Sequence, residues 1–224
     1  MKKLVLKTAK EMGYISNTYA SALRSGKTNT IGIIVPDISN PHLAYQIMLI
    51  EDALRSKSYS IIIMNTNEDE DEERKAIELA VGKQVDGILL CPTQKSDKNI
   101  IFLNKLEIPY LLIGRYFDSL DSDYVCADDI RGGYILGKYL YKKGYRNPIY
   151  IGAYKYIEAS SKRFLGLCDA FSEEGIALSD DVFFEISPKR SSGRELIKKY
   201  YWKIRILIQL LRFLTYWHLK LFLF

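Results

Sequence analysis

The feature that most constrains the fold is a regular alternation of short apolar runs with amphipathic stretches between residues 31 and 174. Six apolar runs predict buried strands: IGIIV (31–35), YSIIIMN (59–65), DGILLC (86–91), YLLIG (110–114), YVCAD (124–128) and PIYIG (148–152). Helical periodicity lies between them, at about 43–57, 70–84, 96–106, 131–143 and 161–174. Continuously apolar strands are buried on both faces, which is typical of a parallel sheet covered by helices. The sequence therefore predicts a doubly wound α/β fold.

The segments that follow the predicted strands form a candidate ligand site. In open α/β sheets, ligands bind outside the carboxyl ends of the strands. We therefore expect one pocket to be formed by Pro36–Leu43, Asn65–Asn67, Pro92–Thr93, Gly114–Phe117, Asp128–Asp129 and Ala153–Arg163. Asp128 and Asp129 directly precede a predicted helix, which favours a capping role for them over ligand binding.

Charge is divided unevenly along the chain. Residues 1–30 carry six Lys and Arg against one Glu, residues 31–197 carry 20 basic and 26 acidic side chains, and residues 198–224 carry six basic and no acidic ones. A basic head on an acidic body favours contact between the head and a polyanion such as DNA. A solvated surface is an equally good interpretation of the charge alone.

Several functional classes are disfavoured by the residues present. Cys91, Cys126 and Cys168 lie far apart without CxxC spacing, which favours free thiols in a reducing cytoplasm. No apolar run of secretory type follows Lys2 and Lys3. With two histidines, no nucleophile elbow, no P-loop and no metal-ligand cluster, we expect no enzyme, no catalytic or metal-binding residues and no cofactor.

The basic head contains two short helical patterns. Residues 4–12, LVLKTAKEM, place apolar side chains on one helical face, and Gly13 fits a helix C-cap. Asn17 can cap a second helix, TYASALR, which ends at Gly26. This second helix has few large apolar residues, so we expect it to be ordered only when docked on a partner.

The end of the chain breaks the pattern. Residues 200–224 contain no Gly, Pro, Ser, Asn, Asp, Glu, Ala or Val, yet hold both tryptophans. The run is about long enough for a membrane span, but Arg212, His218 and Lys220 weigh against one; an interfacial basic helix stays open. We favour a shifted reading frame near residue 200. Tyr-Trp must be encoded TAY TGG, so the shifted frame forces Leu at both Tyr-Trp pairs, and permitted codons elsewhere can give the acidic string LLENPDIDTAIAFSDLLAFEII.

Motifs in a fixed order resemble one protein family. They are VLKTAKEMGY, NTYASALRSGKTNTIGIIVPDISNP, NTNEDEDEE, VDGILLCP, IPYLLIGR, the DD–GG–L–KKGYRNPIYIG region and SSKRFLGLCDAF. Together they resemble the LacI/GalR family of bacterial transcriptional repressors, from residue 4 to about residue 200. The resemblance implies a helical headpiece, a hinge helix and a periplasmic-binding-protein-like core of two subdomains. Only the third headpiece helix is matched, so we expect a chain truncated at its N-terminus.

The resemblance implies DNA contacts in the head of the chain. Tyr14 and Asn17 would lie near the DNA backbone, Leu23 would be a wedge in the minor groove, and Arg24 would contact the minor groove or a phosphate. Such a wedge partly unstacks a base step and lets the bent duplex contact more protein. Without the family pattern, a buried contact between hinge and core would be the favoured role of Leu23.

The resemblance also implies effector contacts. Arg163, in R-x-x-G, can donate to hydroxyls or a carboxylate of a small ligand. His42 and Leu43 replace two aromatic residues that are frequent after Asn-Pro, which puts ligand stacking there in doubt. Gly114 replaces an acid that is frequent before Arg115, so one expected hydrogen-bond acceptor is missing.

The functional expectation is a ligand-responsive, DNA-binding repressor that acts as a cytoplasmic homodimer, with a small molecule such as a sugar as effector and no membrane partner. The predicted domains are 1–30 (partial headpiece and hinge helix), 31–128 and 129–200 (two effector-binding subdomains, the second incomplete) and 201–224 (aberrant tail). We expect impaired binding of operator and effector by such a fragment. The alternative is a solute-binding protein of the same fold, which the missing signal peptide and the basic hinge segment disfavour.

Overall fold

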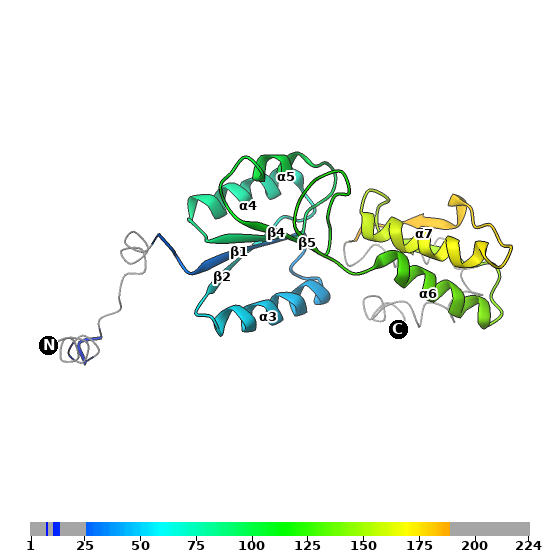
Figure 1. The fold of residues 1–224 in the computed structure, drawn as a ribbon, viewed down its shortest axis with the longest axis horizontal. Helices are drawn as coiled ribbons and strands as arrows, with labels where there is room; N and C mark the ends of the chain where they lie inside the picture. Colours follow the sequence, from blue (N-terminus) through cyan, green and yellow to red (C-terminus); the bar gives the residue numbers. More distant parts are fainter. Residues whose placement is uncertain (1–7, 9–10, 14–25, 189–224) are drawn as a thin grey trace.

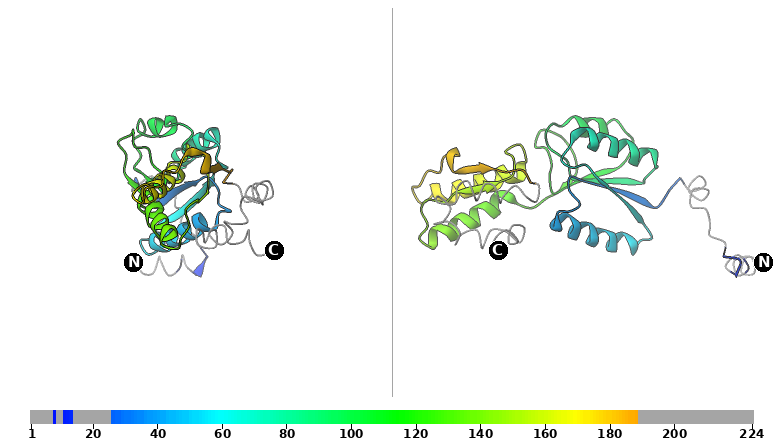
Figure 2. Two further views of the ribbon diagram at one scale, coloured as in Figure 1. Left: turned by 90° about the vertical axis from the view of Figure 1, so that its right-hand side faces the viewer. Right: turned by 180° about the vertical axis from the view of Figure 1, so that it is seen from behind.

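The computed structural model describes Thr8, Glu11–Gly13 and residues 26–188. The described residues form two α/β lobes that follow one another along the chain (Figure 1). The view from behind shows the same two lobes side by side (Figure 2, right). No helix among the residues described has both the length and the apolar character that crossing a membrane requires.

The first lobe is a parallel sheet of five strands in the order β2-β1-β3-β4-β5. Its elements are β1 (Thr30–Val35), α3 (Pro41–Arg55), β2 (Ser60–Asn65), α4 (Glu70–Gly82), β3 (Gly87–Leu90), α5 (Lys98–Leu103), β4 (Tyr110–Ile113) and β5 (Tyr124–Val125). Helix α3 covers one face of the sheet, and α4 and α5 cover the other (Figure 1). The predicted α/β class with helices on both faces of a parallel sheet is confirmed.

Adjacent side chains of β1 build the two layers of the core. Ile34 packs with Ile77 of α4 and Leu90 of β3, whereas Ile33 packs with Leu43 and Ile47 of α3. Both isoleucines are fully buried. Successive side chains of a strand point to opposite faces, so a continuous apolar run is needed where both faces are covered.

The second lobe contains α6 (Asp129–Lys142), β6 (Tyr150–Gly152), α7 (Glu158–Ser172), a 3-10 turn (Asp180–Val182) and β7 (Phe183–Glu185). Strands β6 and β7 pair in parallel. Glycines allow α6 and α7 to approach closely. A Cβ atom at Gly133 would lie 1.9 Å from the carbonyl oxygen of Arg163, and one at Gly166 would lie 1.9 Å from that of Ile130.

Three features differ from the sequence prediction. The prediction that every strand is buried on both faces is wrong for β2. The side chain of Ile63 is 44% exposed there, because β2 is the edge strand of its sheet. Strand β5 has two residues instead of the five expected, and both are exposed. Strand β7 was not predicted, since its FFE run is short and follows acidic residues.

The predicted helices in the basic head fall almost entirely outside the described residues. Within them, the Met12 N–H donates to the Thr8 carbonyl at 2.9 Å, and Gly13 has a φ of 67°. This left-handed conformation fits the helix end expected at Gly13. The tail 201–224 also lies outside the described residues, and the domain boundaries at 30, 128 and 200 stay predictions.

Candidate ligand-binding cleft

A cavity of about 320 Å³ lies at the carboxyl ends of the strands of the first lobe. This volume is at the lower end of the range of small-molecule sites, about 300–1,000 Å³. Six of its nine lining residues are polar or charged, and the full set is Pro36, Asp37, Ser39, Asn40, Leu43, Asn67, Glu68, Arg115 and Pro188. Most of these residues follow β1, β2 and β4, whereas Pro188 follows β7 of the second lobe. The cavity therefore receives residues from both lobes.

Arg115 is held in this cavity by a carboxylate. Its Nη1 donates to Oε2 of Glu68 at 2.9 Å and to the carbonyl of Pro92 at 3.0 Å, and its Nη2 donates to Oε1 of Glu68 at 2.7 Å. The two side chains are 13% and 10% exposed. Burial alone would lower the pKa of Arg115, but the hydrogen bonds and charge of Glu68 outweigh it and raise this pKa. Arg115 is therefore a fixed cation.

The turn after β2 brings Glu68 to Arg115. Asn67 and Glu68 have φ values of 55° and 58°, in the left-handed region. Such residues cost roughly 1 kcal/mol or more each and persist only where surrounding contacts hold them. Asn65 makes two of these stabilising contacts. Its Oδ1 accepts from the Ile38 N–H at 2.7 Å, and its Nδ2 donates to Oδ1 of Asn67 at 2.6 Å. These bonds join the loops after β1 and β2 into one wall.

The side chains of Asp37 and Asn40 are used on this wall as local caps. Oδ1 of Asp37 accepts from the Ser39 N–H at 2.9 Å and the Ser39 hydroxyl at 2.7 Å. Oδ1 of Asn40, the N-cap of α3, accepts from the His42 N–H at 3.1 Å. The wall is therefore rigid and rich in hydrogen-bonding groups.

His42 and Arg163 lie near each other but do not line this cavity. The pKa of His42 is lowered, first by burial and then by the charge of Arg163. Arg163 lies on α7, and its Nε donates to Oδ1 of Asp129 at 2.7 Å. Of the four predicted effector residues, the structure thus places Leu43 and Arg115 in the cavity wall, whereas His42 and Arg163 are not among its lining residues.

A second cavity of about 240 Å³ adjoins Arg115 on the side of the second lobe, and Cys126, Asp128, Glu158 and Lys162 contribute to its lining. Asp128 is the N-cap of α6, and its side chain accepts from the Arg131 N–H at 2.9 Å, so its predicted capping role is confirmed. Asp129 instead accepts from Arg163.

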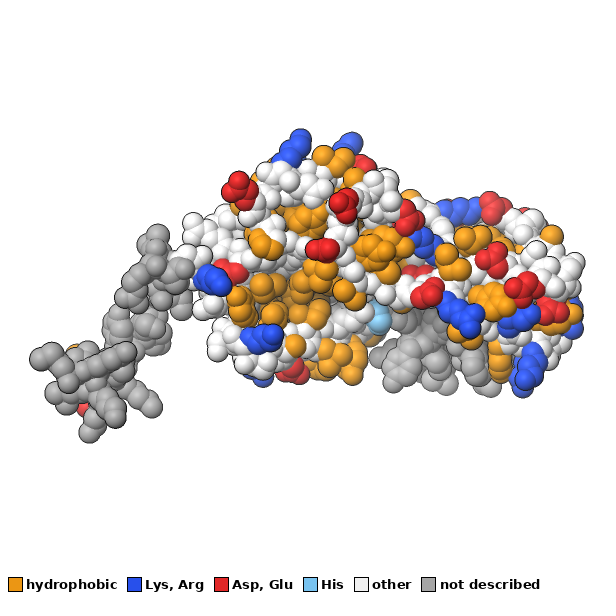
Figure 3. All heavy atoms as spheres, viewed as in Figure 1, with side chains coloured by type: hydrophobic (Ala, Val, Ile, Leu, Met, Phe, Trp, Pro, Cys, Tyr) orange, Lys and Arg blue, Asp and Glu red, His pale blue; other side chains and the backbone are white. Residues whose placement is uncertain are grey.

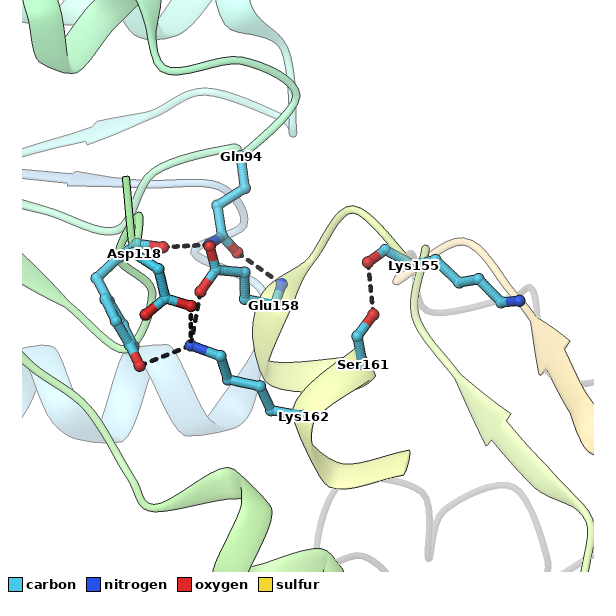
Figure 4. A network of polar contacts seen from close by, with 7 residues as sticks. Gln94, Asp118, Lys155, Glu158, Ser161 and Lys162 are labelled. Atoms are coloured by element: carbon cyan, nitrogen blue, oxygen red, sulfur yellow. Dashed lines mark hydrogen bonds and ion pairs between the residues drawn. The ribbon is translucent and has the colours of Figure 1, made fainter. Parts of the chain in front are cut away.

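Lys162 connects the two lobes beside this second cavity (Figure 4). Its Nζ contacts the hydroxyl of Tyr116 at 2.6 Å, Oδ2 of Asp118 at 2.8 Å and Oε2 of Glu158 at 2.9 Å. It also lies 4.1 Å from the centroid of the Tyr116 ring. The pKa of Lys162 is raised, because these partners outweigh the opposing effect of burial. Tyr116 and Asp118 follow β4, whereas Glu158 and Lys162 begin α7.

Gln94 makes a second connection of this kind (Figure 4). Its Nε2 donates to the carbonyl of Tyr116 at 2.6 Å, and its Oε1 accepts from the Glu158 N–H at 3.2 Å. The first N–H groups of a helix lack partners within the helix, and Ile157, the N-cap of α7, supplies no side-chain bond. A residue of the first lobe therefore caps a helix of the second.

Sequence reasoning missed Glu68 and Gln94, each of which lies one residue beyond a predicted pocket segment. Glu68, from a different strand end, gives Arg115 a carboxylate acceptor next to Gly114. An acidic residue just after a strand was the available signal for Glu68. Gln94 carried none, because its role depends on the position of α7. Tyr14, Asn17, Leu23 and Arg24, the predicted DNA contacts, lie outside the described residues.

Comparison with known proteins gives consistent matches. Residues 28–203 match the family model described as periplasmic binding proteins and sugar binding domain of the LacI family. The HTH-type transcriptional regulator RegA of Clostridium saccharobutylicum is 31% identical over 204 residues, which cover 89% of this chain and 60% of RegA. The chain thus spans about 60% of the length of this relative.

Solved structures show the same fold. A periplasmic binding protein/LacI transcriptional regulator from Alkaliphilus metalliredigens, complexed with D-xylulofuranose, is 26% identical with a TM-score of 0.60, covering 70% of this chain and 56% of that one. The Cra dual regulator from Pseudomonas putida, in complex with fructose 1-phosphate, is 22% identical with a TM-score of 0.68, covering 80% and 65%. At this identity, the second match supports the fold alone.

Proposed function

The chain belongs to the LacI family of periplasmic-binding-protein-like, sugar-binding regulators, and from this premise we propose that it is the effector-sensing part of a DNA-binding transcriptional repressor. The observation that carries the proposal is the cavity at the strand ends, which is lined by residues of both lobes. A ligand there contacts both lobes, so its binding free energy depends on their relative position. That dependence is what a ligand-operated switch requires.

The proposed effector is a small sugar-like molecule. We propose Leu43 and Arg115 of the cavity wall, together with His42 and Arg163, as the residues that contact it. Hydroxyl groups suit this site, because its wall offers carboxylate and amide groups as hydrogen-bonding partners. A guanidinium such as that of Arg163 can donate to two oxygens of one ligand.

The proposed response is a population shift between lobe positions. DNA contacts would come from the basic head, with Tyr14 and Asn17 at the backbone and Leu23 and Arg24 in the minor groove. A change in the angle between lobes in each subunit of a homodimer would alter the spacing of the paired heads. The relatives are transcriptional regulators, and we propose no enzymatic reaction for this chain.

For the homodimer, we propose that a second copy covers the exposed apolar side chains of α3. Tyr45, Met48 and Leu49 are 58%, 48% and 49% exposed on this helix, and Ile63 of the neighbouring edge strand β2 is 44% exposed. Hydrophobic atoms gather on the face of the first lobe seen in Figure 3, where β2 and α3 lie. Contiguous exposed apolar side chains of this kind mark sites of protein association.

The sensing half of the proposal is tested by titrating the purified chain with unphosphorylated pentoses and hexoses in a calorimeter. We expect one of them to bind with saturation and to bind at least about tenfold more weakly to Arg163→Met, the loss of roughly one charged hydrogen bond. Lys155→Met, on an exposed ion pair of the second lobe, is the control. Binding by none of the sugars would contradict a sugar effector.

The DNA half is tested with the product expressed from its own gene, by crosslinking in cells and immunoprecipitation. The expected result is recovery of a few DNA fragments with a shared inverted repeat, and lower recovery after the effector is added. Sugar binding without any selective recovery of DNA would favour a solute-binding protein instead.

A further inference from the structure

The acidic and basic side chains that line the 320 Å³ cavity do not balance, and their net charge affects which ligands can bind. Among the described residues that line it, Arg115 is the basic side chain, whereas Asp37 and Glu68 are acidic. On α7, the charge of Arg163 is matched by Asp129, which accepts from its Nε at 2.7 Å. The lining therefore has a net negative charge.

The arginine of the lining is not available to an anion. Glu68 binds both terminal nitrogens of Arg115 in a parallel two-bond arrangement, and Pro92 takes a further N–H. This is the geometry with which a guanidinium binds a carboxylate or phosphate ligand. Glu68 thus occupies the position that an anionic group of a ligand would take.

Other polar groups of the lining can accept hydrogen bonds from neutral donors. Asp37 uses Oδ1 for Ser39, and within the described residues no hydrogen bond engages its Oδ2. A ligand hydroxyl can donate to this oxygen, whereas a phosphate would be repelled by it. Asn40 and Asn67 add amide groups that suit hydroxyls.

From these contacts we propose that Glu68 is a specificity-determining residue that makes the cleft select neutral, polyhydroxylated ligands and reject phosphorylated or carboxylated ones. This inference rests on the proposed function, because it concerns the effector of the same cleft. By holding Arg115, Glu68 supplies an internal carboxylate in place of a ligand anion.

The test compares the wild-type chain with Glu68→Gln in inorganic phosphate, at ionic strength matched with chloride. In Glu68→Gln the guanidinium of Arg115 loses its charged partner, so phosphate can bind where the Glu68 carboxylate was. At a phosphate concentration about tenfold above Kd, we expect the Tm of this variant to rise by on the order of 3–6 °C. The Tm of the wild-type chain and of Glu72→Gln, whose carboxylate pairs with Lys75 on the exposed side of α4, should not change.

Equal phosphate stabilisation of the wild-type chain, or none in a folded Glu68→Gln, would overturn the proposal. Removing one partner of a buried ion pair is strongly destabilising, so a second measurement covers a variant that does not fold. In it, the wild-type chain is titrated with ribose and ribose 5-phosphate, and with glucose and glucose 6-phosphate. A phosphate ester that binds as tightly as its neutral sugar contradicts the role of Glu68. If none of the four compounds binds, the proposed sugar effector is contradicted. The response of the wild-type chain to inorganic phosphate still tests the role of Glu68 on its own.

Discussion

His42 lies in the first turn of α3, next to Leu43 of the cavity wall. Its pKa is lowered first by burial and then by the charge of Arg163. Both effects disfavour the imidazolium, so the folded chain resists protonation more than the unfolded chain does. A histidine at this position therefore makes stability depend on pH near neutrality.

We expect the free energy of unfolding to fall as the pH decreases below the unfolded pKa of about 6.5, since the unfolded state takes up the proton first. The decrease ends below the folded pKa. Buried Glu73 acts in the opposite sense, because burial raises its pKa and folding then favours proton uptake. The measurement is urea unfolding from pH 7.5 to pH 5 for the wild-type chain and His42→Gln. The slope of the unfolding free energy against pH should differ between the two proteins, and this difference is the contribution of His42. Identical slopes would contradict a lowered pKa of His42.

At the scale of single elements, the contact between α6 and α7 depends on which glycines face the neighbouring helix. Gly132 and Gly133 are adjacent in α6, yet a Cβ at Gly132 would meet no atom within 4 Å, whereas one at Gly133 would lie 1.9 Å from the Arg163 carbonyl oxygen. Two glycines that look identical in the sequence thus have opposite roles.

Gly133→Ala should destabilise the chain by about 3 kcal/mol, because α7 has to move away from α6. Gly132→Ala should stabilise it by about 0.5–1 kcal/mol, because alanine lowers the entropy of the unfolded chain and favours the helix. Denaturant titration of both variants measures the difference. Equal effects of the two substitutions would show that the helices do not cross at Gly133.

The connection of α7 to the first lobe gives a second prediction at this scale. Lys162→Met removes the contacts with Tyr116, Asp118 and Glu158 and should cost about 1–2 kcal/mol. It should also allow the lobes to separate, which would raise the radius of gyration in small-angle scattering. Lys155→Met is the matched control, because Lys155 pairs with Asp180 within the second lobe at an exposed position worth under about 1 kcal/mol. A change of the same size in both variants would argue against a connection between lobes.

At the scale of the whole molecule, the exposed apolar side chains of α3 decide the expected assembly. Leu49 of α3 and Leu79 of α4 are 49% and 50% exposed, so they form a matched pair on opposite faces of the first lobe. If a second copy docks on α3, a charged side chain at position 49 should prevent dimerisation, whereas one at position 79 should not.

Sedimentation velocity should show a dimer for the wild-type chain and for Leu79→Glu, and a monomer for Leu49→Glu, because a buried unpaired carboxylate opposes association. A far-ultraviolet circular dichroism spectrum verifies that each variant is folded. A monomeric wild-type chain, or a dimer that survives Leu49→Glu, would contradict the proposed interface.

From β1 to α7, the order and type of the elements follow from the amino-acid sequence, because apolar periodicity reflects burial along the chain; the short strand β7 does not. The sequence also located the cavity, since the carboxyl ends of parallel strands meet at one edge of a sheet. The partners across the fold were decided by the tertiary structure alone. Glu68 reaches Arg115 and Gln94 caps α7 only because distant segments are brought together, and the exposure of β2 depends on its place at the sheet edge. Such contacts leave no periodic signal, because they join residues whose separation along the chain follows no rule.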